Sequence, residues 1–127
     1  MSFRGYQGLT VWNRAIDLVE LTYHLTNVLA GEATPEILAD MRRSALAIPS
    51  HLAAGYQTSC TEEYLKHVHA AQLTLASLDT RVTTIHRLQW VEDEDIDELQ
   101  SLLTHVDQLL CCLERYLTTN PSGARAQ

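Results

Sequence analysis

The six histidines and three cysteines of this chain are the residues whose types could bind a metal ion or act as nucleophiles. Glu20 and His24 lie four residues apart, as do Glu63 and His67, so each pair could share a cation on one face of a helix. The Glu-x-x-His repeat of di-iron bundles does not occur in the sequence. We therefore predict no metal and no cofactor, and keep a small metal-binding bundle as an alternative.

The cysteines do not suggest catalysis or a disulfide framework. Cys111 and Cys112 are adjacent and Cys60 stands alone, an odd and poorly spaced set that agrees with a reducing compartment. The sequence has no glycine-rich phosphate loop, no H-E-x-x-H and no G-x-S-x-G. These observations predict a protein that is not an enzyme and has no catalytic residues.

Length and composition predict one domain over residues 1–119, followed by a flexible tail over 120–127. The chain has 127 residues, of which 46% are hydrophobic, a size at which one core buries most of the chain. Its net charge of −7 disfavours a nucleic-acid binder. No run resembles a membrane span or a signal peptide, so we expect a cytoplasmic protein without a membrane partner.

Four helical segments must position any site, with breaks predicted at 31–35, 55–61 and 92–95. Pro49 predicts a kink or a break inside the second segment. Apolar residues of the last two segments recur at alternating steps of three and four, which gives each helix one buried seam. The predicted seam residues are Tyr64, Val68, Ala71, Leu75, Leu78, Val82, Ile85, Ile96, Leu99, Leu103, Val106, Leu110, Leu113 and Leu117. Short connections then predict an all-α, up-down-up-down antiparallel four-helix bundle.

The first helix is apolar on two sides, which a lone bundle does not need. One stripe runs from Trp12 to Tyr23, and a second lies on nearly the opposite side. A second apolar face implies a further burial partner, and an identical subunit is the simplest one. The predicted oligomer interface comprises Val11, Leu18, Leu21, Leu25, Val28, Leu102, Leu109 and Tyr116. An irregular monomer with a central first helix is the alternative.

Two segments carry a family resemblance. Residues 9–15 read L-T-V-W-N-R-A, and residues 42–55 contain R-R-x-A-x-x-I-P-S and end on a glycine. On these motifs the chain resembles the bacterial four-helix bundle proteins named after the intervening sequences of 23S ribosomal RNA. That family includes Avd, the accessory variability determinant of diversity-generating retroelements, and the similarity spans roughly residues 3–117.

The resemblance implies a four-helix subunit that assembles into a ring-like homopentamer with a non-enzymatic role. Avd-like members are thought to bind RNA and a reverse transcriptase. The sequence departs from the family at His51, where Asn is usual, and at Ala54, where Glu is usual. It also departs in charge, because Avd-like members are basic and this chain is acidic.

These expectations predict a scaffold or adaptor that docks a reverse transcriptase or another basic protein or protein–RNA assembly. The candidate contact residues are Arg42, Arg43, His51, Glu92, Asp93, Glu94 and Asp97. The acidic run is more simply a solvated helix start favoured by the helix dipole, and the two arginines could pair with Glu36 or Asp40. Direct RNA or DNA binding through a basic rim at the arginines is the alternative.

Overall fold

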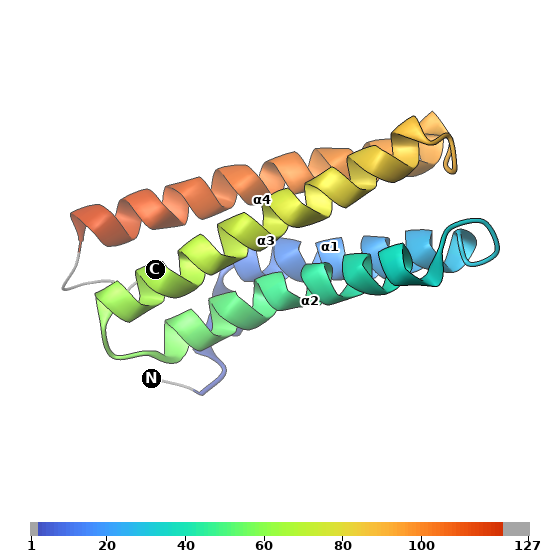
Figure 1. The fold of residues 1–127 in the computed structure, drawn as a ribbon. Helices are drawn as coiled ribbons and strands as arrows, with labels where there is room; N and C mark the ends of the chain where they lie inside the picture. Colours follow the sequence, from blue (N-terminus) through green and yellow to red (C-terminus); the bar gives the residue numbers. More distant parts are fainter. Residues whose placement is uncertain (1–2, 121–127) are drawn as a thin grey trace.

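The computed structural model describes residues 3–120, which form a four-helix bundle (Figure 1). A 3₁₀ turn, η1, precedes the helices. The elements are η1 (Gly5–Gly8), α1 (Thr10–Val28), α2 (Pro35–Gln57), α3 (Thr61–Arg87) and α4 (Asp93–Thr119). Each helix runs antiparallel to the next and packs on it, and α4 returns beside α1. The predicted all-α, up-down-up-down bundle is therefore confirmed for the single subunit.

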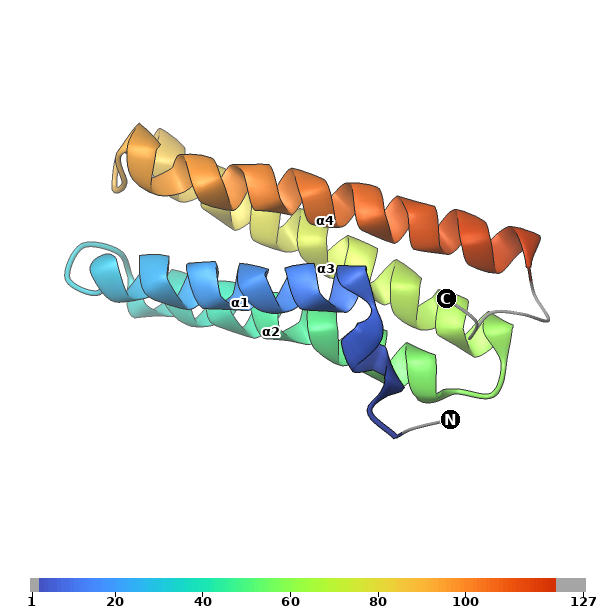
Figure 2. The same cartoon turned by 180° about the vertical axis from the view of Figure 1, so that it is seen from behind.

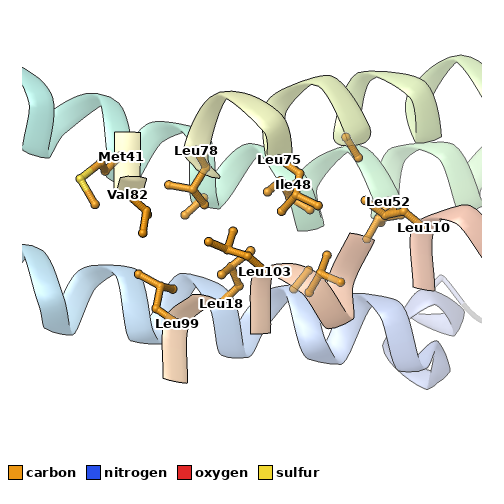
Figure 3. Packing of buried hydrophobic residues seen from close by; sticks show 14 of the residues in the cluster. Leu18, Met41, Ile48, Leu52, Leu75, Leu78, Val82, Leu99, Leu103 and Leu110 are labelled. Atoms are coloured by element: carbon orange, nitrogen blue, oxygen red, sulfur yellow. The ribbon is translucent and has the colours of Figure 1, made fainter. Parts of the chain in front are cut away.

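The core consists of the residues that the helical periodicity predicts. All seven predicted seam residues of α3 and all seven of α4 are buried. Figure 3 shows Leu78 of α3, Leu103 of α4 and Leu18 of α1 directed into one shared interior. An apolar residue at each inward turn explains why these helices form, because burial of that seam provides most of their stability.

The break predicted at residues 55–61 begins too early in the sequence, because α2 ends at Gln57 and α3 begins at Thr61. Gly55 is buried inside α2, which ends at Gln57. A Cβ on Gly55 would lie 2.8 Å from Cδ1 of Tyr64 and 3.0 Å from Cβ of His67. The glycine therefore serves the close approach of α2 and α3 rather than a turn.

Helix α2 continues through Pro49, so of the two predicted alternatives, a kink or a break, the break does not occur. Pro49 itself is buried, and so are Ile48 and Leu52 beside it. Burial of these side chains offsets the one backbone hydrogen bond that proline removes. At the start of the same helix, Thr34 occupies the N-cap position and Pro35 the first helical position.

The last helix ends at Thr119, with Asn120 as its C-cap. Residues 121–127 of the predicted tail, and residues 1–2 of the predicted domain, lie outside the described residues. Over residues 3–120, none of the helices combines the length and the apolar sequence needed to cross a bilayer.

Candidate functional site

Helices α1 and α4 lie side by side (Figure 2). Three hollows follow one another along the seam between them, and together we call them the groove. Its largest hollow has a volume of about 500 Å³ and lies between the middle of α1 and the first half of α4. A second hollow shares Leu21 and Glu98 with the first and extends towards the end of α1. A third lies further along the same seam, where Val11 faces Leu109 and Cys112.

Large aliphatic side chains line this groove without being fully covered. Leu21, Leu102 and Leu109 pack against the core but remain partly exposed. Val28, at the end of α1, is 64% exposed. These residues offer apolar surface that the single subunit leaves in contact with water.

The groove is acidic as well as apolar. Its central and α1-terminal hollows are lined by five acidic residues and one arginine: Asp17, Glu20, Glu94, Asp95, Glu98 and Arg14. A salt bridge of 3.0 Å joins Nη2 of Arg14 to Oδ2 of Asp17, so the arginine is already paired within its own helix. The remaining carboxylates give the groove a negative potential that favours a positively charged occupant.

The eight residues predicted as an oligomer interface divide into two groups. Val11, Leu18 and Leu25 are at most 5% exposed and belong to the core of the subunit, so their predicted role in an outer interface is corrected to core packing. They point inward because α1 presents this stripe to the other three helices. The other five remain partly or largely exposed: Leu21, Val28, Leu102, Leu109 and Tyr116.

The other apolar stripe of α1 lies on the outer side, next to α2. Trp12, Ile16 and Val19 are partly buried, and Tyr23 is 39% exposed. On α2, Leu46 is 48% exposed one turn after Arg42, which contacts α1. We refer to these five apolar residues with Arg42 as the α1–α2 face.

The two adjacent arginines point to different partners. Arg42 donates from Nε to Oγ1 of Thr26 at 2.7 Å, and its guanidinium lies 5.5 Å from the ring centroid of Tyr23. Arg43 is largely exposed and its Nη1 pairs with Oδ1 of Asp40 at 3.0 Å. The predicted pairing of an arginine with Asp40 is confirmed, and Arg42 also ties α2 to α1.

The acidic run forms the start of α4. Glu92 is the N-cap residue and Asp93, Glu94 and Asp95 occupy the first turn, where the helix dipole stabilises negative charge. Asp93 also accepts a hydrogen bond at 2.6 Å from Nε2 of His86, at the end of α3. All four carboxylates are exposed, so the cap leaves them accessible to a docked molecule.

Sequence reasoning missed a histidine pair between α2 and α3. Nδ1 of His51 lies 3.2 Å from Nδ1 of His67, in reach of one hydrogen bond. Burial lowers the pKa of His51 below its ordinary value of 6.5, and the neighbouring His67 lowers it further. One feature of the sequence could have indicated this pair: Gly55 lies one turn after His51, and a glycine inside a helix is typical of a place where a second helix approaches closely.

A second unpredicted cluster joins α3 to α4. Glu114 accepts hydrogen bonds from Nε2 of Gln72 at 3.1 Å and from Nε2 of His69 at 2.9 Å. The hydrogen bond from Gln72 lowers the pKa of Glu114, and the one from His69 adds to the effect. Among the residues that the structure describes, no group of three or more His, Cys, Asp or Glu side chains could hold a metal ion.

The fold and these surfaces place the protein in the class of four-helix bundles, with partly exposed apolar residues on both sides of α1: in the α1–α4 groove and on the α1–α2 face. The sequence matches the 23S rRNA-intervening sequence protein family over residues 7–111. Since this match covers most of the chain, the protein belongs to that family, and the resemblance drawn from residues 9–15 and 42–55 is confirmed. No curated protein matches the sequence.

Proposed function

We propose that this protein is a non-catalytic scaffold that self-associates, with the α1–α4 groove of one copy receiving the α1–α2 face of the next. The partly exposed aliphatic side chains of the groove, Leu21, Val28, Leu102 and Leu109, carry the proposal. The groove is acidic and the α1–α2 face presents Arg42, whose hydrogen-bond partners Thr26 and Asn27 are uncharged, so the two surfaces are complementary in charge as well as apolar.

A contact between two different surfaces closes into a ring when its rotation divides a full turn. The family resemblance of this chain favours five copies. Leu18 is fully buried and packs in the core of each subunit, whereas Val11 and Leu25 pack in the core and also line hollows of the groove.

Sedimentation velocity at micromolar concentration tests the association. Val28→Asp puts a charge into the groove, whereas Leu73→Asp changes an aliphatic residue that is 74% exposed on α3, outside both surfaces. We expect an oligomer for the parent chain and for Leu73→Asp, and mainly 14.3 kDa subunits for Val28→Asp. A parent chain that sediments as a single subunit would refute the proposal.

The scaffold in turn docks a basic protein, and a reverse transcriptase is the candidate that the Avd resemblance favours. The exposed carboxylates at the start of α4 support this docking. Pull-down of the purified reverse transcriptase with a variant carrying lysine at Glu92, Asp93, Glu94 and Asp97 tests it. Loss of capture by this variant, with capture retained when Glu62 and Glu63 are reversed instead, is the expected result.

Direct RNA binding makes a different prediction. Gel-shift titration in about 50 mM salt favours phosphate contacts, so binding there that disappears in Arg43→Glu would support it. The net charge of −7 and the engagement of Arg42 with Thr26 and Tyr23 favour the protein-docking scaffold.

A further inference from the structure

The histidine pair between α2 and α3 has a defined geometry. The two Nδ1 atoms are 3.2 Å apart, the ring centroids are 5.5 Å apart and the ring planes are inclined by 42°. His51 and His67 are both partly buried, so each side chain is partly covered by the bundle and partly exposed to solvent.

The backbone beneath the pair is fixed by helix packing. Gly55 lies one turn from His51 on α2, and a Cβ there would come within 3.0 Å of Cβ of His67. Tyr64, which precedes His67 by three residues on α3, is buried and packs against the same glycine. Two rigid helices therefore hold both imidazoles at short range before any ligand arrives.

The separation of the two nitrogens suits two ligands of one metal ion. Zinc binds histidine nitrogen at about 2.0–2.1 Å, so two nitrogens on one ion are about 2.9 Å apart at a right angle and about 3.4 Å apart in a tetrahedron. The observed 3.2 Å falls between these values. At this N–N separation the ion would lie about 1.3 Å to one side of the line joining the two nitrogens.

We propose that His51 and His67 form a two-histidine site for a divalent transition-metal ion such as Zn²⁺ or Cu²⁺, which joins α2 to α3. In the free protein one Nδ1 carries the proton of the hydrogen bond. Metal binding moves that proton to Nε2 of the same ring, exchanged through water, so both neutral rings present an Nδ1 lone pair and no net proton is released.

The chemistry of the pair agrees with such an ion. Neutral imidazole is a preferred ligand of Zn²⁺, Cu²⁺ and Ni²⁺. Glu63, one turn from His67, is engaged with Nζ of Lys66 at 3.1 Å, so water or a donor from a docked molecule completes the coordination.

Titration calorimetry of the full-length chain with Zn²⁺ tests the site, with any affinity tag removed and Cys60, Cys111 and Cys112 replaced by serine. The three thiols are exposed and would otherwise compete for the ion. We expect one ion per subunit. Mutation of a residue that only hydrogen-bonds to a metal ligand lowers metal affinity roughly 10- to 100-fold. Loss of a ligand itself should lower the affinity at least as much, so we expect His51→Asn and His67→Asn each to weaken Zn²⁺ binding at least about tenfold. His105→Asn, an exposed histidine on α4, is the matched control and should bind like the parent.

A second measurement separates loss of the site from loss of the fold. Metal at about a hundredfold excess over its Kd should raise the melting temperature of the parent by roughly 10 °C. Variants that keep the parent's helical circular dichroism should show no such rise. In the electron paramagnetic resonance spectrum of bound Cu²⁺, two nitrogens are expected in the parent. Equal affinity of parent, His51→Asn and His67→Asn, or a spectrum without nitrogen coupling, would overturn the proposal.

Discussion

The seam between α2 and α3 and the seam between α1 and α4 are built from different residues and have different consequences. At the first, a glycine lets the helices approach until ring and backbone atoms touch. At the second, leucines and a valine hold the helices apart over a groove that stays partly open. The comparison shows that one seam of a bundle can be tightly packed and stabilise the subunit, while another seam keeps apolar surface exposed for association.

Truncation of an apolar side chain should cost most in the closed part of the bundle. Ile48→Ala removes a fully buried side chain of α2 and should lower the free energy of unfolding by about 2–5 kcal/mol. Leu102→Ala, in the groove, should cost only about 1 kcal/mol in the separated subunit, because water already reaches the leucine. Urea unfolding monitored by circular dichroism measures both. Equal losses would show that the groove is as well packed as the core.

A larger residue at Gly55 should overpack the α2–α3 seam. Gly55→Val places branched carbon atoms against Tyr64 and His67 and should destabilise the fold by about 1–3 kcal/mol. Gly8→Ala is the matched control, since a Cβ there meets no heavy atom within 4 Å. A small or absent effect of Gly55→Val in the same urea assay would mean that the two helices are not held together at this point.

Acid should weaken the α2–α3 seam through His51. Its pKa in the folded state lies below the value of 6.5 expected in the unfolded chain, so the unfolded state takes up the proton first. The stabilising contribution is therefore complete above pH 6.5 and declines as the pH falls through 6.5 towards the folded-state pKa. Unfolding at pH 7.5 and 5.5 measures the decline, which His51→Gln should reduce and His24→Gln, on α1, should leave unchanged.

Thiol labelling should report on the α1–α4 seam without changing stability. Cys112 lines the groove, whereas Cys111 beside it does not. Partial desolvation raises the pKa of the exposed Cys111 thiol, and the charge of Asp107 raises it further, so Cys111 serves as the reference thiol outside the groove. Cys112 should be alkylated more slowly in the parent oligomer than in Val28→Asp subunits. Equal rates, measured by mass spectrometry, would place the contact between copies elsewhere.

Helices, their order and the core could be predicted from the sequence, because each depends on residues close together along the chain. The buried seams of α3 and α4 follow from local periodicity, and all fourteen predicted residues are buried. The candidate sites were harder to predict. Leu18 and Leu25 were assigned to an outer stripe and lie in the core, whereas Tyr23 belongs to the stripe that remains outside.

Four helices, one apolar seam on each of the last two, and membership of the family could all be derived from the order of the amino acids. The packing of the four helices was needed to show which apolar stripe of α1 faces the core and that His51 contacts His67. Periodicity gives the direction in which a side chain points from its own helix, but its contacts depend on where the other helices pack around that helix. Short connections make consecutive helices antiparallel, but they do not determine whether the bundle is left-turning or right-turning.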